Sequence, residues 1–341
     1  MARTKLRVGT FNLYNLNEPG MRMYRNAGGW TQEEYDKKIA WAADKLIRLE
    51  PDVWGFQELW HIDSLKAIFA KAGLTNEYSL LVPNTQTGQK IICAAAVKTK
   101  ILRGQAQWIE GFPELFKLDS GGDDTQTADI SVQISSFSRP VLHFRIKPRS
   151  KGKQIDVYVC HLKSKRPTNI YREAWYSSST YSKHGEAIGS AISTIRRTAE
   201  AAALRMMLTE QMKGTETPII VLGDLNDSQH SNTLNIITGQ PNYLLSGLSR
   251  GGSDVDLYSV GSLQKYRSQK DVYYTHIFNN SHESLDHILV SQEFYDNSKK
   301  RIWAFAGMEI ANDHLNTEKH KLEGSTDHGI VCAEFEYRPA R

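Results

Sequence analysis

The fold is decided by the stretch Pro218-Ile-Ile-Val-Leu-Gly-Asp-Leu-Asn-Asp227. Four consecutive aliphatic residues predict a strand that is buried on both faces. Asp224 and Asn226 follow two residues apart, so in an extended chain their side chains point the same way. Gly, Asp and Asn are also ordinary turn formers, so this stretch alone fits a turn as well as a functional site. The rest of the chain has to separate these two interpretations.

The bulk composition is that of an ordinary globular protein, because the 341 residues are 40% hydrophobic and 23% charged. The 42 basic against 38 acidic side chains permit an anionic substrate without demanding one. Cys93, Cys160 and Cys332 lie in apolar runs without paired or metal-binding spacing, which predicts buried thiols in a reducing compartment. We therefore expect a cytoplasmic protein, with a secreted form that has lost its signal peptide as the alternative. No apolar run approaches the roughly 20 residues of a membrane span.

Strands outnumber helices, and neither a linker nor a fixed-period repeat divides the chain. A helix is expected over Thr31–Leu49, because Thr31 and Glu34 form a capping-box pattern and Pro51 follows. A long Ala-rich helix is expected over Gly185–Met212. Strands are expected at 6–13, 52–58, 91–97, 132–146, 154–162, 284–291 and 329–337. Turns rather than crossover helices separate many of them, which favours an α+β sandwich of mainly antiparallel sheets and a single domain over residues 1–341.

Polar side chains recur at the ends of these apolar strands. They are Asn12, Glu58, His161, Asp224, Asn226, Asp286, Asp327 and His328. If the strand ends share one edge of the fold, carboxylates, carboxamides and imidazoles gather there. Oxygen-rich sites suit a hard cation such as Mg²⁺ or Mn²⁺, and the set does not show the thiolate and multi-histidine pattern of a zinc site.

Six short motifs occur in a fixed order along the chain. They are Thr10-Phe-Asn12, Phe56-Gln-Glu58, Cys160-His-Leu162, Gly223-Asp-Leu-Asn226, Leu285-Asp-His-Ile288 and Thr326-Asp-His328. Together they resemble the ordered motifs of the endonuclease/exonuclease/phosphatase superfamily, from residue 6 to about residue 335. The resemblance implies a deoxyribonuclease I-like, four-layer α/β/β/α sandwich of two mainly antiparallel sheets. This sequence departs from the family pattern in the last motif. Many members have a proline two residues after the histidine, whereas here Gly329-Ile330 follows His328.

The resemblance also implies roles for individual residues. Glu58 matches the principal metal-binding glutamate, with Asn12 and Asp327 beside it. Asp224 matches the aspartate that orients or deprotonates the attacking water, and Asn226 matches the asparagine that holds a phosphate oxygen or the nucleophile. The remaining matches are His161 as a donor to the phosphate, His328 as the last histidine, and Asp286 as the carboxylate that orients His328. A carboxylate on one imidazole nitrogen fixes the tautomer and favours the charged ring.

Basic residues near these motifs are candidates for substrate binding. Lys163, Lys165 and Arg166 directly follow His161, and Arg139 resembles an arginine that many family members bring near the phosphate. Of the adjacent Arg196 and Arg197, one is expected at the surface, which leaves the other to face the site. A cluster of aromatic residues comes between the basic run and the long helix; it comprises Tyr171, Trp175, Tyr176 and Tyr181. We expect it to pack onto the sandwich, and base stacking is the alternative.

The resulting expectation is a divalent-metal-dependent phosphodiesterase, most simply an endo- or exonuclease that hydrolyses DNA, with RNA as the second choice, by in-line attack of water. One alternative keeps the chemistry and changes the substrate to a phosphomonoester or to a lipid or inositol phosphate. Another is a non-catalytic member that only binds nucleic acid, although the motif set is complete. No apolar loop suited to a membrane surface and no strand pattern that requires a protein partner is present, so a monomer is expected.

Overall fold

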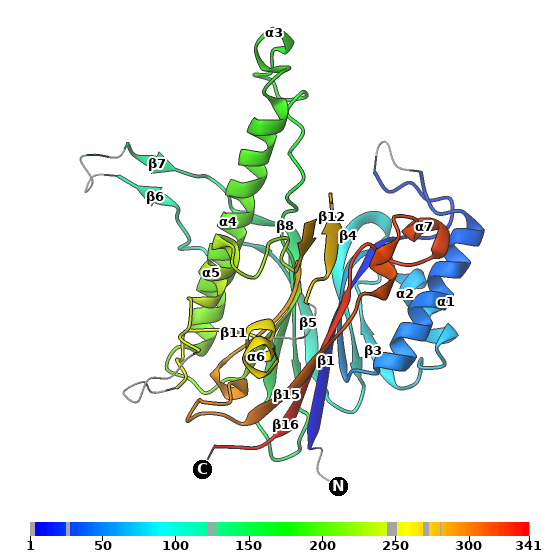
Figure 1. The fold of residues 1–341 in the computed structure, drawn as a ribbon, viewed down its shortest axis with the longest axis vertical. Coiled ribbons are helices and arrows are strands. Elements are labelled where there is room, and N and C mark those ends of the chain that lie inside the picture. The colour runs from blue at the N-terminus through cyan, green and yellow to red at the C-terminus, as the bar shows by residue number, and fades with distance from the viewer. Residues whose placement is uncertain are drawn as a thin grey trace.

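The computed structural model describes residues 4–24, 28–121, 126, 128–243, 251–268, 273–279 and 281–340. Two six-stranded sheets face each other at its centre (Figure 1). The first sheet has the order β15-β16-β1-β2-β4-β3, with β1 (Lys5–Leu16), β2 (Val53–His61), β3 (Tyr78–Leu81), β4 (Thr87–Lys98), β15 (Trp303–Ala311) and β16 (Ile330–Tyr337). The second has the order β11-β14-β10-β9-β8-β5, with β5 (Leu102–Gly111), β8 (Ser136–Ile146), β9 (Ile155–His161), β10 (Ile219–Asp224), β11 (Tyr258–Ser259) and β14 (Asp286–Val290).

Strand pairing is antiparallel except at the centre of each sheet. There β1 pairs with β2 and β9 pairs with β10 in parallel. Each parallel pair carries its carboxyl ends to the same edge, which brings the segments after Asn12, Glu58, His161 and Asp224 toward one end of the fold. The expectation of mainly antiparallel sheets is confirmed.

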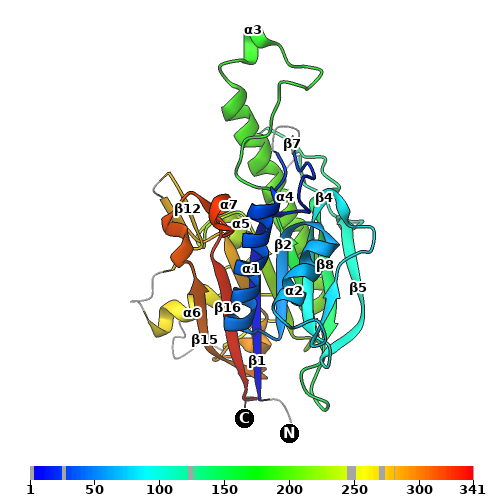
Figure 2. The same ribbon diagram turned by 90° about the vertical axis from the view of Figure 1, so that its right-hand side faces the viewer.

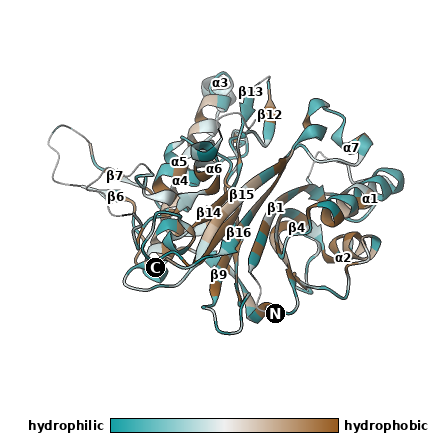
Figure 3. Cartoon of the chain, turned by 60° about the horizontal axis from the view of Figure 1, so that its bottom comes forward, coloured by the Kyte–Doolittle hydropathy of each residue, from teal (hydrophilic) through white to brown (hydrophobic). Residues whose placement is uncertain are grey.

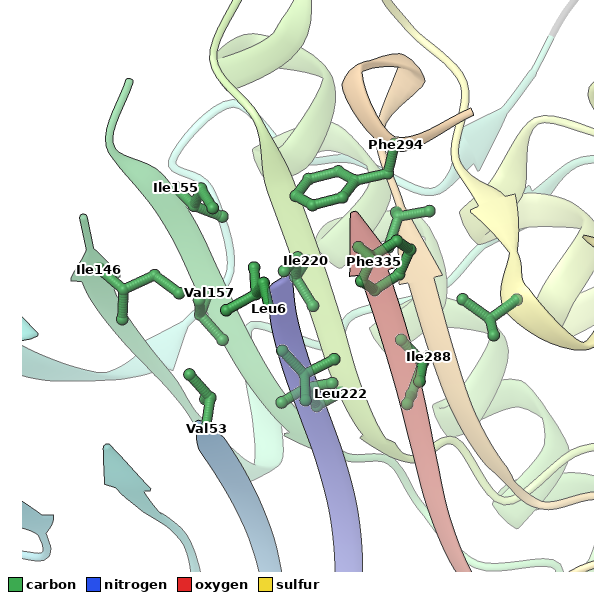
Figure 4. Close-up of a cluster of buried hydrophobic side chains, with 14 of the residues drawn as sticks. Leu6, Val53, Ile146, Ile155, Val157, Ile220, Leu222, Ile288, Phe294 and Phe335 are labelled. Atoms are coloured by element: carbon green, nitrogen blue, oxygen red, sulfur yellow. The ribbon is translucent and has the colours of Figure 1, made fainter. Parts of the chain in front are cut away.

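The space between the sheets is filled by branched aliphatic and aromatic side chains (Figure 4). Leu6 and Val53 of the first sheet face Ile220 and Leu222 of the second, and all four are fully buried. Burying a side chain of this kind stabilises the fold by about 1.5–3 kcal/mol. This shared core fixes the two sheets face to face and so fixes where their ends meet.

Helices cover both outer faces and complete four layers. The first sheet is covered by α1 (Gln32–Leu49) and α2 (Ile62–Lys71), and the second by α4 (Gly185–Met212) and α5 (Asn232–Thr238). The shorter helices are α3 (Ser178–Tyr181), α6 (Val260–Arg267), α7 (His320–Glu323), η1 (Gln292–Phe294) and η2 (Asp313–Asn316), and two hairpins are formed by β6 (Asp119–Ser120) with β7 (Ile130–Ser131) and by β12 (His276–Phe278) with β13 (Ser281–Glu283). Figure 3 shows the hydrophobic colour concentrated in the central strands, whereas α7 and much of α1 are hydrophilic. The predicted α/β/β/α sandwich is confirmed.

The start of α1 follows its sequence signal. The hydroxyl of Thr31 accepts a hydrogen bond from the backbone N–H of Glu34 at 3.2 Å, and the Glu34 carboxylate accepts one from the N–H of Thr31 at 2.9 Å. This reciprocal pair satisfies two N–H groups that the first turn leaves free. The helix then ends at Leu49, as predicted from Pro51.

Strand β10 occupies the centre of the second sheet, between β9 and β14. Its residue Gly223 has a φ of +153°, and a Cβ there would lie 2.0 Å from the backbone oxygen of Cys160. Only glycine permits this approach, so β9 and β10 end side by side and present His161 and Asp224 as a register pair. The stretch that fitted a turn or a site is therefore a buried strand whose last residue stands at the meeting point of both sheets.

Several elements differ from the sequence expectations. Strands β5 and β15 have no predicted counterpart, because both lie at or near sheet edges, where partly exposed strands carry a weaker apolar pattern. The aromatic cluster was expected to pack onto the sandwich, and this prediction is wrong. The cluster lies instead with α3 at the end of an arm, residues 164–196, that leads away from both termini (Figures 1 and 2). Within the part of the chain that the structure describes, no helix is long and apolar enough to cross a membrane.

Candidate active site

Asp224 is the buried centre of the cluster formed where the strand ends meet. Its Oδ2 atom accepts a hydrogen bond from Nδ2 of Asn12 at 3.2 Å and lies 3.4 Å from Nε2 of His161. Its Oδ1 atom accepts from the backbone N–H of Asn226 at 2.9 Å. The pKa of Asp224 is raised to about 7, chiefly by burial and also by Asp286 and Glu58, against the lowering effects of His328 and of the Asn226 N–H. This carboxyl group therefore titrates close to neutral pH.

His328 and Asp286 form a buried pair on one side of Asp224. Nδ1 of His328 lies 2.8 Å from Oδ2 of Asp286, and Nε2 lies 3.9 Å from Oδ2 of Asp224. Burial lowers the pKa of His328, but Asp286 and Asp224 raise it by more, so the pKa lies well above its usual range. The ring is thus a cation held between two carboxylates. The hydroxyl of Thr275 accepts from the backbone N–H of Asp286 at 3.1 Å and fixes the start of β14.

His161 has the opposite electrostatic character. It is buried, and burial lowers the pKa of His161 well below its usual range, with Arg139 and His328 lowering it further. Its Nε2 lies between Asp224 and Glu58, at 3.4 Å and 3.9 Å from the nearest carboxylate oxygens. A neutral imidazole therefore stands on one side of Asp224, and the charged ring of His328 stands on the other.

Glu58 and Asp327 are the candidate metal ligands together with Asn12. Glu58 Oε2 accepts from the backbone N–H of Asn15 at 2.8 Å. Burial raises the pKa of Glu58, and the neighbouring Asp327 carboxylate raises it further. A glutamate whose charge is disfavoured by burial and by a second carboxylate, together with a carboxamide, is a donor set that fits a hard divalent cation, since the cation offsets that repulsion. The residues present therefore fit the metal that the family uses.

Two further groups of ligating atoms lie in the same cluster. Within one group, atoms of Asp224, Asp286 and His328 all lie within 4.8 Å of one another, and within the other the same holds for His276, Asp327 and His328. His276 lies on β12, and its ring centre is 5.1 Å from that of His328. No strand-end motif contains it, so it could be found only from the bridge that β12 makes with the loop before β16.

Backbone strain is concentrated at these residues. Glu58 has a φ of +61° and Asn226 a φ of +54°, and Tyr14 and Asn15 after the first motif have φ values of +55° and +53°. Residues other than glycine rarely adopt this left-handed backbone conformation. It costs about 1–3 kcal/mol per residue and persists where the surrounding structure enforces it. The strand was predicted to end at Glu58, but β2 continues to His61. The left-handed conformation turns Glu58 inward within this strand.

Asn226 is held by the loop that follows β9. Its Nδ2 donates to the backbone oxygen of Leu162 at 3.0 Å, and the N–H of Leu162 donates to the backbone oxygen of Asp224 at 3.1 Å. His287, to which the sequence assigned no role, contacts the backbone oxygen of Asp227 through Nε2 at 2.9 Å. These three contacts hold the turn after β10 in place.

The basic candidates separate into two groups. Arg139 and Lys163 lie together on the rim of a cavity of about 710 Å³ beside the cluster. Tyr24, Trp60 and Phe137 also line this cavity. Neither forms an ion pair with a carboxylate in the described parts of the chain. Lys165, by contrast, pairs with Glu283 at 2.9 Å, and Arg166 is exposed at the base of the arm.

Glu200 is a buried glutamate that was not predicted from the sequence. It holds the backbone next to Arg139 and at Lys163 in place. Glu200 accepts the backbone N–H of Ser138 at one oxygen and that of Lys163 at the other, both at 2.7 Å. Arg197 lies beside it, buried, and reaches Asp227 at 3.3 Å, whereas Arg196 is partly exposed. The available signal was a charged pair at i and i+3 on an otherwise apolar helix.

Lys38 is a second residue that the sequence left unassigned. It is fully buried in α1 and donates from Nζ to the backbone oxygen of Ser325 at 2.8 Å. Burial lowers the pKa of Lys38 to about 7, against the raising effects of Asp327 and Glu58. Nothing in the sequence around Lys38 indicated that it supports the loop carrying Asp327.

The fold and this site together define a class, the metal-dependent phosphoesterases. The chain belongs to the endonuclease/exonuclease/phosphatase family, whose model matches residues 9–328. The resemblance drawn from the six motifs is thereby confirmed.

Solved structures show the same fold at low sequence identity. The human Nocturnin catalytic domain with bound sulfate is 15% identical, over 98% of this chain and 95% of that one, with a TM-score of 0.56. A Bacteroides thetaiotaomicron mannosyl-6-phosphatase is 16% identical, over 97% and 100%, with a TM-score of 0.53. D. rerio TDP2 humanised by 14 mutations is 14% identical, over 97% and 99%, with a TM-score of 0.54. No curated protein is significantly similar in sequence.

Proposed function

We propose that this chain is a divalent-metal-dependent phosphodiesterase that hydrolyses DNA, with RNA as the second substrate. The observation that carries the proposal is the arrangement around Asp224. A carboxyl group with a pKa of about 7 lies 3.9 Å from the charged ring of His328, which Asp286 holds in place. A base that ionises near neutral pH is well matched to accepting a proton from water at that pH.

In this proposal Glu58, Asp327 and Asn12 hold Mg²⁺ or Mn²⁺. The ion, when bound, supplies positive charge next to a phosphate oxygen. Arg139 and Lys163, which form no ion pair with a carboxylate among the described residues, supply further positive charge on the cavity side of the cluster.

Asp224 orients a water molecule and accepts its proton as the water oxygen bonds to phosphorus. The bond from phosphorus to the 3′ oxygen breaks, and that oxygen leaves with a proton taken from solvent. His328, His161 and Asn226 stabilise the negative charge that grows on the phosphate during this displacement. The products are a 5′-phosphate and a 3′-hydroxyl.

The cavity beside Arg139 and Lys163 supports a diester over a small monoester. A phosphate held by these two cations leaves most of the cavity of about 710 Å³ for a group attached to it, next to Tyr24 and Trp60. Aromatic side chains beside a phosphate site accept nucleobases. A phosphomonoesterase, a lipid or inositol phosphate hydrolase and a non-catalytic nucleic-acid-binding protein are the competing functions.

A substrate panel separates these functions. Purified protein with Mg²⁺ or Mn²⁺ is assayed on plasmid DNA, RNA, bis(p-nitrophenyl) phosphate, p-nitrophenyl phosphate, sphingomyelin and inositol phosphates. We expect hydrolysis of the nucleic acid and of the diester, and 5′-phosphate ends on the products. Turnover of the monoester or of a lipid without the diester contradicts the proposal, as does full activity of Glu58→Ala or Asp224→Ala.

A further inference from the structure

The chain between His161 and Arg197 leaves the sandwich and returns, forming an arm of residues 164–196 that includes α3 and the first turns of α4 (Figures 1 and 2). Both ends of the arm join the active-site cluster. Lys163 follows His161 by two residues, and its backbone oxygen accepts from Arg197 at 3.3 Å. From Gly185 to Arg197 the helix spans about 18 Å at about 1.5 Å per residue. The arm therefore carries its aromatic end well beyond the proposed scissile phosphate.

The arm is a packed element. The hydroxyl of Thr168 contacts that of Ser193 at 2.9 Å, and the Ser193 hydroxyl donates to the backbone oxygen of Arg166 at 2.8 Å. A Cβ at Gly189 would lie 2.2 Å from the backbone oxygen of Thr168, so only glycine lets the outgoing segment lie against α4. Ile170 is buried in the same contact. The arm thus holds its outer residues in a defined position.

The outer part of the arm exposes aromatic rings. Tyr171 and Trp175 are 51% and 49% exposed, while Trp175 contacts Tyr181 edge-on with ring centres 5.2 Å apart. Tyr181 and Tyr176 are partly buried and support the cluster from within. Exposed rings on a rigid support are stacking surfaces, because each keeps a free apolar face at little entropic cost.

Cations accompany the rings. Residues 163–186 contain five Lys and Arg and two Glu. In the described parts of the chain, Arg166, Arg172 and Lys183 form no ion pair with a carboxylate, and Arg172 lies over the ring of Tyr171 at 5.2 Å. These three charges remain free to contact an anion.

A cavity of about 390 Å³ lies at the base of this surface. Tyr171, Tyr176, Arg166 and Asn169 contribute to its walls, together with Glu186. Its volume lies within the range of about 300–1,000 Å³ that small-molecule sites occupy. Two rings, a guanidinium and an amide are groups that contact a nucleobase and its phosphate.

We propose that the arm binds single-stranded nucleic acid, stacking unpaired bases on Tyr171 and Trp175 and contacting phosphates with Arg166, Arg172 and Lys183. This inference rests on the proposed phosphodiesterase function, for which it names an unpaired strand as the preferred substrate. Bases within a duplex are already stacked on one another, so the arm discriminates against them.

The polar character of the arm's end favours nucleic acid over a lipid surface. Between Trp175 and Lys183 the sequence is Tyr-Ser-Ser-Ser-Thr-Tyr-Ser, which offers hydroxyl groups and no aliphatic side chain. Insertion into a bilayer interface requires a continuous apolar face. Serine and threonine hydroxyls beside aromatic rings are instead suited to phosphate and base contacts.

The test measures binding by fluorescence anisotropy in EDTA, with the full chain and a labelled single strand of about 12 nucleotides. The same sequence in a blunt duplex is the comparison probe, and vesicles with phosphatidylserine are the lipid probe. The variants are the double change Tyr171→Ala with Trp175→Ala, and the ring-preserving Trp175→Phe. Tyr266→Ala is the matched control, because Tyr266 is 56% exposed on α6, outside the arm. Hydrolysis of bis(p-nitrophenyl) phosphate by the wild-type protein tests the phosphodiesterase function separately.

We expect tighter binding of the single strand than of the duplex, and a loss of about fivefold or more in single-strand affinity for the double variant. Trp175→Phe and Tyr266→Ala keep most of the affinity. Equal binding of both probes, no single-strand binding at all, or an unchanged affinity of the double variant would overturn the inference. Vesicle binding that the double variant loses would overturn it in favour of a lipid surface.

Discussion

Nδ1 of His328 lies 2.8 Å from Oδ2 of Asp286, with both side chains buried, and this contact holds an imidazolium beside Asp224. The two residues come from different parts of the chain, since Asp286 begins β14 and His328 precedes β16. A charged ring in the interior requires such a partner, because burial alone would drive the ring to its neutral form.

Asp286→Asn tests this contact. The amide cannot balance the ring charge, so we expect the pKa of His328 to fall and kcat to drop by about 10²–10⁴ with a smaller change in KM. Histidine titration by NMR and steady-state hydrolysis of bis(p-nitrophenyl) phosphate give the two values. Asp63→Asn, which changes a carboxylate on the exposed start of α2, is the control. An unchanged pKa of His328 would contradict the electrostatic role of Asp286.

Asp224→Asn separates activity from stability. The folded pKa of about 7 exceeds the ordinary 3.8, so the folded state holds an extra proton between these values and wild-type stability falls as pH rises from about 4 to about 7. Asn lacks this penalty. We expect the variant to lose activity, to match the wild type near pH 4, and to gain up to about 4 kcal/mol over it above pH 7. Urea unfolding in EDTA at a series of pH values measures the difference, and a gain that does not vary with pH would count against the assignment.

Metal removal tests the donor set around Glu58. We expect EDTA to abolish hydrolysis and Mg²⁺ or Mn²⁺ to restore it. Glu58→Gln keeps the shape of the side chain but loses its charge, so half-maximal activity should require about tenfold or more metal. The melting temperature in Mn²⁺ provides a readout that does not depend on activity, since binding to the folded state raises it in the wild type and less in the variant. Equal metal responses would exclude Glu58 as a ligand.

Lys38→Met tests the buried lysine under the Asp327 loop. The folded pKa of about 7 lies below the ordinary 10.5, so the folded state binds fewer protons over this window and wild-type stability rises as pH increases from about 7 to 10.5. Methionine removes that dependence but leaves the backbone oxygen of Ser325 unpaired, at about 1–3 kcal/mol. We therefore expect the stability of the variant relative to the wild type to improve as pH falls through this window. A constant difference between the two proteins would show that Lys38 stays charged in the fold.

The fold could be predicted where local patterns are strong. The buried run at Ile219–Leu222, the capping box at Thr31 and the Ala-rich repeat of Gly185–Met212 each determine an element from its own sequence. Edge strands such as β5 were missed, since they bury only part of one face and carry little periodicity. The position of the aromatic cluster could not be predicted either, because the sequence pattern does not distinguish aromatic residues in a core from aromatic residues on an exposed arm.

The family and the identity of the candidate groups could be predicted from the amino-acid sequence, because each motif couples a buried strand to the polar residue at its end. How those groups act on one another depends on the packing of the folded chain. The charge on His328, the neutrality of His161 and the near-neutral titration of Asp224 depend on distances between elements far apart in the chain. The hydrogen bond from Lys163 to Glu200 and the ion pair of Lys165 with Glu283 also depend on the approach of residues far apart in the chain. A side chain's type specifies which interactions it can make, whereas burial and the approach of distant strands specify which of them it does make.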